Sequence, residues 1–225
     1  VQMKIAILGN GKMGKKIAEL AVEKGYEIVA VSSSNNPAIN LDLSTTDIAI
    51  DFSTPTTAFE NITHAINSGI PVVSGTTAWL DKLQEVEKLC RNKNVAFLYA
   101  SNFSLGMNLF FELNKKLAKL MNCQHYKCKI HEFHHTEKLD TPSGTAKTLA
   151  EDVEKIQQKK IDISADRIQN VAGKHSVIYN SIVDEIEIKH TAKNREGFAR
   201  GALLAAEWII GKKGVFSMKD VLNIE

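Results

Sequence analysis

The chain of 225 residues, with 44% hydrophobic and 24% charged side chains, has the composition of an ordinary globular protein and is long enough for one large or two modest domains. Its 28 basic and 26 acidic residues give a formal net charge of +2, and this near balance disfavours binding to nucleic acid or to an anionic membrane surface. No apolar run approaches the roughly eighteen residues of a transmembrane helix, and no signal peptide precedes the first strand pattern, so we expect a cytoplasmic protein.

The cysteines carry no signature of a special function. Cys90, Cys123 and Cys128 are odd in number and lack C-x-x-C spacing. This pattern fits reduced thiols better than a disulfide framework or a zinc site.

A glycine-rich turn follows the first predicted strand, Met3–Leu8, and apolar residues at helical spacing follow the turn. The turn consists of Gly9, Asn10, Gly11, Lys12, Met13 and Gly14. The pattern G-x-G-x-x-G between a strand and a helix is typical of a dinucleotide site, where the first glycine makes the turn and the second admits the pyrophosphate. The same spacing also occurs in folds that bind no nucleotide, so the motif alone leaves both alternatives open.

Strand and helix patterns alternate over the first hundred residues. Strands are predicted at 3–8, 27–32, 47–52, 71–74 and 95–99, and helices near 12–24, 56–68 and 80–92. Gly25, Gly69 and Asn94 stand where those helices should end in a left-handed residue. The alternation predicts an α/β fold, in which a doubly wound, Rossmann-like parallel sheet carries helices on both faces.

Small polar loops follow three of these strands. They are Ser53-Thr54-Pro55, Gly75-Thr76-Thr77 and Ala100-Ser101-Asn102-Phe103. Ligands of such sheets bind beyond the carboxyl ends of the strands, so we expect these loops to line a nucleotide cleft.

The pattern changes after Ser104. A helix is predicted at 105–121, a strand at 126–133, a helix from about 143 to 158, strands at 177–179 and 181–190, and a final apolar helix at 201–210. Charged and apolar residues alternate at the end of the 181–190 segment, which indicates a sheet with one wet or interface-facing side. These elements predict an inserted α+β region with an open sheet.

The stretch from Glu132 to Ala146 concentrates groups that bind and protonate an anion. His134, His135 and Lys138 supply positive charge and transferable protons. The following Pro-Ser-Gly-Thr is typical of a turn that opens a helix, and free backbone N–H groups at a helix start favour an anion such as a carboxylate. Ser143 is expected to be a helix cap or a carboxylate ligand.

The chain resembles the 4-hydroxy-tetrahydrodipicolinate reductase (dihydrodipicolinate reductase) family. The hallmark of that family is a histidine pair followed by K-x-D-x-P-S-G-T-A, which stands here from His134 to Ala146. The resemblance extends through Asp51-Phe52-Ser53, Gly75-Thr76-Thr77, Asn102-Phe103-Ser104 and the segment 201–222, so it covers nearly the whole chain.

The resemblance implies an NAD(P)H-dependent oxidoreductase of the diaminopimelate route to lysine. The substrate would be the cyclic dicarboxylate formed from 4-hydroxy-tetrahydrodipicolinate by loss of water, and the product tetrahydrodipicolinate. Residues 1–104 plus 196–225 would form the dinucleotide-binding domain, and 105–195 the substrate-binding and tetramerisation domain, with hinge crossings near 104 and 196. The resemblance also implies a homotetramer.

The resemblance assigns roles to individual residues. His134 would donate the proton, and Lys138 would do the same or stabilise the developing negative charge. Arg195, on the far hinge strand, would assist. Substrate carboxylate would bind to His135, Ser143, Gly144 and Thr145. The coenzyme would bind to Gly9, Asn10, Gly11, Lys12, Met13, Gly14, Ser33, Ser34, Gly75, Thr76, Thr77, Ala100, Ser101, Asn102 and Phe103.

The end of the second strand lacks the acid of an NAD-preferring site. The segment 32–36 reads Ser-Ser-Ser-Asn-Asn, whereas the family often has an acidic-basic pair at Ser33 and Ser34. Serines can hydrogen-bond a 2′-phosphate without repelling it. This tilts the expectation towards NADPH without excluding NADH.

Two rival functions use only one motif each. The segment from His131 to His135 reads H-E-x-x-H, which is a zinc signature when it lies on a helix. Residues four apart lie about 13 Å from each other on the predicted strand, against roughly 6 Å on a helix. No metal is therefore expected at this motif. His131 is expected to pack or hydrogen-bond locally. A metal hydrolase would leave the glycine motif unused, and a non-catalytic nucleotide sensor would leave the histidine and lysine cluster unexplained.

Several further polar and aromatic residues have a structural interpretation. A nucleophilic role for Ser143 is not expected because the G-x-S-x-G context is missing. Asp140 is expected to stabilise a turn, and solvent exposure is expected for His64, His125 and His175. Both tryptophans, at 79 and 208, are expected to pack in the fold.

Overall fold

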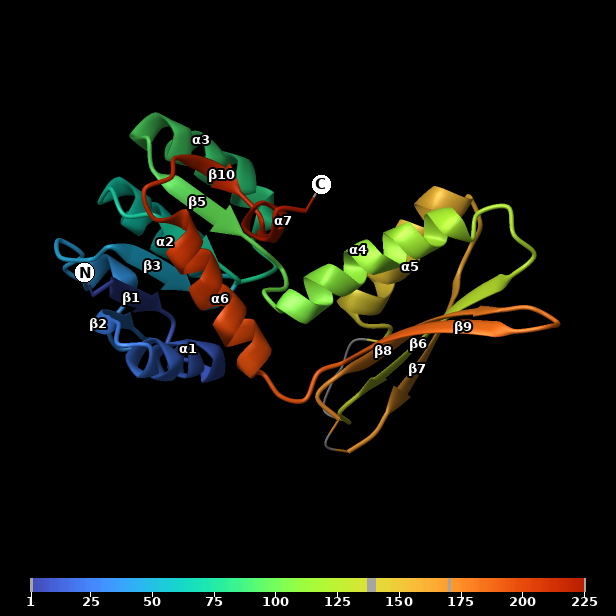
Figure 1. Ribbon diagram of the computed structural model, residues 1–225. Helices are drawn as coiled ribbons and strands as arrows, with labels where there is room; N and C mark the ends of the chain where they lie inside the picture. Colours follow the sequence, from blue (N-terminus) through green and yellow to red (C-terminus); the bar gives the residue numbers. More distant parts are fainter. Residues whose placement is uncertain (1, 137–140, 170, 225) are drawn as a thin grey trace. The chain divides into compact units, whose positions relative to one another are not determined.

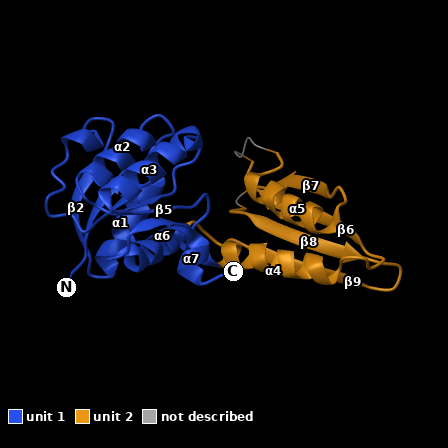
Figure 2. Cartoon of the chain, turned by 90° about the horizontal axis from the view of Figure 1, so that it is seen from above, with its two compact units in different colours: residues 1–105, 196–225 blue, residues 106–195 orange. Residues whose placement is uncertain are grey.

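The computed structural model describes residues 2–136, 141–169 and 171–224. The chain divides into two compact units (Figures 1 and 2): unit 1 comprises Val1–Leu105 with Glu196–Glu225, and unit 2 comprises Gly106–Arg195. In the described part of the chain, no helix has both the length and the apolar character needed to cross a membrane.

Unit 1 contains a six-stranded sheet in the order β10-β5-β4-β3-β1-β2, and all neighbouring strands run parallel. The strands are β1 (Lys4–Leu8), β2 (Glu27–Ser32), β3 (Ile48–Asp51), β4 (Val72–Ser74), β5 (Ala96–Tyr99) and β10 (Gly214–Phe216). The Rossmann-like parallel sheet expected from the sequence is therefore confirmed.

Helices cover both faces of this sheet because its strands are apolar on both sides. They are α1 (Lys12–Glu23), α2 (Ala58–Asn67), α3 (Leu83–Lys93), α6 (Glu196–Ile209) and α7 (Met218–Leu222), with short 3-10 helices at Ala38–Asn40 and Leu80–Lys82. In β1, Ile5 and Ile7 pack in the cluster that includes α1 and α6, whereas Ala6 and Leu8 pack in the cluster that includes α2 and α3. The side-chain alternation of a single strand thus joins two hydrophobic cores.

The helix ends follow the expected chemistry. Gly25, Gly69 and Asn94 have positive φ angles of 82°, 77° and 56° at the ends of α1, α2 and α3, as the sequence predicts. A left-handed residue at this place turns the chain away from the helix and into the next strand.

Unit 2 contains a four-stranded mixed sheet in the order β7-β6-β8-β9. The strands are β6 (Lys127–His134), β7 (Asp162–Arg167), β8 (Lys174–Asn180) and β9 (Glu185–Thr191), and the helices are α4 (Leu105–Leu120) and α5 (Gly144–Gln157). Both helices lie on one side of the sheet (Figure 1), where Phe110, Ile130, Leu149 and Val177 share a core. The alternating exposure of β7 and β9 leaves the other side of the sheet open.

Six elements differ from the sequence prediction. The strands β7 and β10 and the helix α7 were not expected, and β8 begins at Lys174 rather than at 177. The predicted strand 181–190 contains a turn at Ser181–Asp184 before β9 begins, and α6 begins at Glu196 rather than at 201. β10 has only three residues, and the alternation in β7 is polar, so neither strand has a strong apolar period.

Candidate active site

The glycine turn of unit 1 is closely packed at two of its three glycines. A Cβ on Gly9, whose φ is +116°, would lie 2.3 Å from the backbone oxygen of Phe52, and one on Gly14 would lie 1.9 Å from the backbone oxygen of Gly9. A Cβ on Gly11 would have no neighbour within 4 Å among the described residues. Gly9 and Gly14 are thus required by the fold, while Gly11 leaves open space at the start of α1, where a pyrophosphate needs a close backbone approach.

A hollow of about 720 Å³ lies beside this turn. Its lining includes Gly9, Asn10 and Gly11 together with Ser33 and Ser34, so the structure brings these predicted residues together. The Ser32 hydroxyl accepts a hydrogen bond from the Gly9 N–H at 2.9 Å, which joins the end of β2 to the turn. No acidic side chain is among the described residues that line the hollow.

A second hollow of about 420 Å³ is lined by further predicted residues of this edge, whereas Gly14 lines neither hollow. Lys12, Met13, Gly75, Thr76 and Thr77 line it, and Gly11 and Phe52 line both hollows. The open space at Gly11, the start of α1 and the uncharged serines at the end of β2 are compatible with binding of a dinucleotide.

The loop at 100–103 differs from the other loops. Ala100, Ser101, Asn102 and Phe103 are not among the residues that line either hollow. Phe103 is 1% exposed, and its ring lies 5.6 Å from that of Phe52, so it packs in the core. Contact of this loop with a coenzyme stays a prediction.

Asp51 at the end of β3 organises the loops that line the second hollow. Its carboxylate accepts hydrogen bonds from the hydroxyls of Ser53 at 2.6 Å, Ser74 at 2.8 Å and Thr76 at 2.7 Å. Burial raises the pKa of Asp51, and these hydroxyl groups oppose that shift. The sequence analysis quoted Asp51 as part of the resemblance but did not recognise this role.

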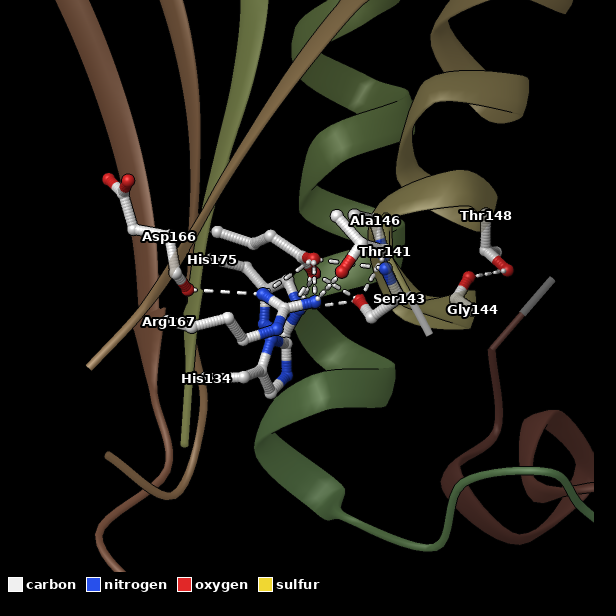
Figure 3. Close-up of polar contacts among 10 residues, drawn as sticks. His134, Thr141, Ser143, Gly144, Ala146, Thr148, Asp166, Arg167 and His175 are labelled. Atoms are coloured by element: carbon white, nitrogen blue, oxygen red, sulfur yellow. Dashed lines mark hydrogen bonds and ion pairs between the residues drawn. The ribbon is translucent and has the colours of Figure 1, made fainter. Parts of the chain in front are cut away.

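Unit 2 contains a buried polar cluster around Glu132. In the sheet register, Glu132 on β6 lies opposite His175 on β8, and His134 on β6 lies opposite Arg167 on β7. Glu132 and His134 are two residues apart on one strand and therefore share a face. Figure 3 shows His134, Arg167, His175 and Ser143 converging on one place.

The carboxylate of Glu132 joins the sheet to the start of α5. The backbone N–H of Ser143 donates to Oε1 at 3.0 Å, and the Ser143 hydroxyl donates to Oε2. The Ser143 hydroxyl oxygen also accepts from the Ala146 N–H at 3.2 Å, which confirms Ser143 as the helix cap. This places the first turn of α5 directly beside the end of β6.

Positive groups surround the same carboxylate. Its oxygens lie 3.3 Å from His134 Nδ1, 3.5 Å from His175 Nε2 and 3.4 Å from Arg167 Nη2. Burial alone would raise the pKa of Glu132, but hydrogen bonds from His175 and Ser143 and the charge of His134 outweigh it and lower the pKa to about 2. Glu132 is therefore an ionised carboxylate although its side chain is fully buried.

The predicted catalytic residue His134 and the predicted substrate-binding residues lie around this cluster. His134 is 8% exposed at the end of β6, and His135 is half-buried in the next position. Gly144 and Thr145 form the first turn of α5, where backbone N–H groups have no partner within the helix. Lys138 and Asp140 lie outside the described residues.

The zinc signature does not form. His131 lies within β6, where it contacts Asp166 at 2.7 Å and stacks on Phe133, so its local role is confirmed. The ligand atoms of Glu132, His134 and His175 do lie within 4.8 Å of one another. However, the carboxylate in that group already accepts from Ser143 and faces Arg167, so we interpret the group as a network of hydrogen bonds and ion pairs.

The expectation for His175 was wrong. It is 3% exposed and contacts Glu132, whereas the sequence predicted a solvent-exposed histidine. His64 is half-buried and His125 is exposed. Strand alternation alone could have placed Glu132 beside His134, but His175 and Arg167 could not be found because β8 was predicted too short and β7 was not predicted.

Both tryptophans pack as expected. Trp79 is 2% exposed and donates from Nε1 to the Thr76 backbone oxygen at 2.7 Å. Trp208 on α6 contacts Phe216 with a ring separation of 5.1 Å. The Trp79 bond also helps to hold the loop that lines the second hollow.

Comparison with known proteins assigns the family. Residues 3–103 match the model for the N-terminus of dihydrodipicolinate reductase, and residues 106–222 match the model for its C-terminus. A 4-hydroxy-tetrahydrodipicolinate reductase of Christiangramia forsetii is 47% identical over 98% of each chain. One of Buchnera aphidicola subsp. Schizaphis graminum is 34% identical over 94% of this chain and 83% of its own length.

Solved structures agree at the level of the fold. The dipicolinate-bound dihydrodipicolinate reductase from Paenisporosarcina sp. is 22% identical and has a TM-score of 0.77 over 98% of this chain and 99% of its own. Aspartate semialdehyde dehydrogenase II of Vibrio cholerae reaches a TM-score of 0.55 at 12% identity, covering 92% of this chain and 98% of its own. With both halves of the chain matched, this protein belongs to the dihydrodipicolinate reductase family.

Proposed function

We propose that this protein reduces the dihydrodipicolinate-type intermediate, formed from 4-hydroxy-tetrahydrodipicolinate by loss of water, to tetrahydrodipicolinate in the diaminopimelate route to lysine. As a member of its family it is an oxidoreductase that uses a nicotinamide coenzyme. The observation that carries the proposal is the contact of Glu132 with both His134 and Ser143, because it brings a proton donor beside the first turn of α5. A related structure holds dipicolinate, a planar dicarboxylate, which supports a substrate of that class.

The two units have different tasks in this proposal. Unit 1 binds the coenzyme through the glycine turn, Ser33, Ser34 and the loop 75–77. Unit 2 binds the substrate and mediates assembly. The boundaries of the structural units at 105/106 and 195/196 support this division.

The coenzyme supplies a hydride to the conjugated ring of the substrate. Reduction then requires a proton at the neighbouring atom, and His134 donates it, because imidazole titrates near neutral pH. Lys138, four residues along the chain, assists by donating a proton or by stabilising the negative charge.

The carboxylates of the substrate bind to His135 and to the first turn of α5. Gly144 is exposed and Thr145 is half-buried, so their backbone N–H groups and the Thr145 hydroxyl are suited to this role. Ser143 contributes chiefly by fixing that turn, because its own hydroxyl donates to Glu132 and accepts from Ala146.

NADPH is the preferred coenzyme in this proposal. The hollow beside β2 is lined by Ser33, Ser34 and Asn35, without an acid among its described lining residues. A 2′-phosphate meets no repulsion there and finds hydroxyl and amide partners, whereas an NAD-preferring site places a carboxylate at the end of this strand.

The open side of the unit 2 sheet supports a homotetramer with closed symmetry. Ile186 on β9 is 39% exposed, and β9 forms the edge of its sheet. Apolar side chains on an unpaired edge strand are a liability unless another surface covers them.

The activity is tested with the full chain, NADPH and enzymatically generated dihydrodipicolinate in excess chelator. NADPH absorbance is expected to fall only when both enzyme and substrate are present. Absence of NADPH oxidation both with and without the chelator would refute the proposed reaction, whereas oxidation seen only without the chelator would instead support a metal-dependent mechanism.

A further inference from the structure

We infer that Glu132 is a positioning residue for proton delivery: its buried carboxylate holds the imidazolium of His134 and orients that ring for transfer of a proton from Nε2. The inference rests on the proposed role of His134 as the proton donor. It adds Glu132 as the anion behind the donor and His175 as a second imidazole that shares the same oxygen. Neither residue contacts the substrate in this arrangement.

The sheet register creates the arrangement. Glu132 pairs with His175 across the antiparallel β6 and β8, while His134 pairs with Arg167 across the parallel β6 and β7. Because Glu132 and His134 point to the same face of β6, their partners on both neighbouring strands meet around one carboxylate. The contact therefore depends on the fold and on three strands together.

Charge explains why this carboxylate attracts protons to its neighbours. The ionisable groups that face it are His134 from β6, Arg167 from β7 and His175 from β8. His190 on β9 lies opposite His175. Burial, and to a lesser extent the charge of His175, lowers the pKa of His190. Arg167 carries a permanent positive charge. The cluster gains a second positive charge when one of its imidazoles is protonated.

The two imidazoles depend on the same carboxylate oxygen. Oε2 of Glu132 lies 3.3 Å from His134 Nδ1 and 3.5 Å from His175 Nε2, while Arg167 approaches Oε1 at 3.4 Å. Protonation of one imidazole opposes protonation of the other, because like charges a few ångströms apart repel. His134 and His175 therefore compete for one anionic partner.

The orientation of the His134 ring determines which nitrogen delivers the proton. Nδ1 faces Glu132, so Nε2 points away from the carboxylate. A Cβ on Gly173 would lie 3.3 Å from Nε2, and the glycine avoids that crowding. A carboxylate on one ring nitrogen that leaves the other for chemistry is a common means of orienting a histidine.

The test is the pH dependence of turnover in Glu132→Gln. A general acid works in its protonated form, so turnover falls as pH rises through its titration. Removing the negative charge makes the imidazolium easier to deprotonate. The alkaline limb of the pH–turnover profile, where turnover falls with rising pH, should therefore move to lower pH by about one unit or more. Glu132→Asp keeps the charge, so its limb should stay closer to that of the wild type even if its turnover is lower.

A matched control distinguishes charge from general damage to the sheet. Asp166→Asn removes the carboxylate that contacts His131 on the exposed part of the same sheet, and it should leave the limb unchanged. An unshifted limb in folded Glu132→Gln, or equal shifts in the Gln and Asp variants, would overturn the inference. If His134→Gln also retained full turnover, the proposed donor itself would be wrong.

A second measurement uses the wild-type chain and does not depend on the folding of a variant. Nitrogen-15 NMR of labelled histidines should show a proton on His134 Nδ1, the nitrogen that faces Glu132. A bare Nδ1 on His134 would contradict the proposed orientation of the ring, whatever the activity of the enzyme.

Discussion

The carboxylate of Asp51 accepts a hydrogen bond of 2.7 Å from the hydroxyl of Thr76, and this contact joins the ends of β3 and β4 in unit 1. Thr76 Oγ1 in turn accepts from the Ser53 N–H at 2.9 Å. Two loops that line the proposed coenzyme site are therefore held by one buried acid. Their positions depend on a side chain that lies beneath the site.

Asp51→Ala should weaken both the fold and coenzyme binding. The hydroxyls of Ser74 and Thr76 are buried and would lose their acceptor, which is expected to cost about 2 kcal/mol or more in the free energy of unfolding. Urea unfolding and calorimetric titration with NADPH would measure the two effects. Asp47→Ala is the matched control, because the Asp47 carboxylate accepts a single exposed bond from Lys4, and it should cost less than half as much.

His134→Gln should lower turnover while leaving coenzyme binding intact. If His134 is the general acid, its loss should reduce turnover by about 10²-fold or more, since proton transfer must then come from a poorer donor. Steady-state kinetics and NADPH affinity are the measurements, and His125→Gln on an exposed turn is the control. Unchanged turnover in His134→Gln would shift the donor role to Lys138 or to water.

Ser33→Glu should weaken NADPH binding selectively. The new carboxylate would stand in the hollow beside β2, where it would repel a 2′-phosphate and accept from the ribose hydroxyls of NADH. Calorimetric titration with both coenzymes should show NADPH bound at least as tightly as NADH by the wild type, and the order reversed in the variant. Thr45→Glu places the same charge at an exposed position that lines neither hollow and should change neither affinity. A clear NADH preference in the wild type would contradict the prediction.

The full chain should be a homotetramer. Light scattering at micromolar concentration is expected to give four times the chain mass of 24.9 kDa. Ile186→Glu on the edge strand β9 should reduce the mass, whereas Leu80→Glu, at a similarly exposed leucine in unit 1, should not. A monomer in the wild type would refute the assembly, and a dimer would leave only one of the two expected interfaces.

Local patterns in the sequence were enough to predict much of the fold. The apolar runs before Gly9 and Ser53, the helical spacing after Gly11, and the left-handed ends at Gly25 and Asn94 depend on neighbouring residues alone. Backbone sterics and side-chain burial act over a few residues, so their signals remain readable without knowledge of the partners. The Ser143 cap belongs to the same class, because its acceptor and donor lie three residues apart.

The tertiary structure decided which distant residues meet. Glu132 and His175 are separated by 43 positions in the printed sequence, and their contact depends on the register between β6 and β8. Strand alternation determines the face of each side chain, but a shift of one residue in the pairing would turn His175 to the other face. The sequence by itself therefore determined the two motifs, their local structure and the family resemblance, whereas only strand pairing decided that a buried carboxylate lies between the proposed proton donor and the first turn of α5.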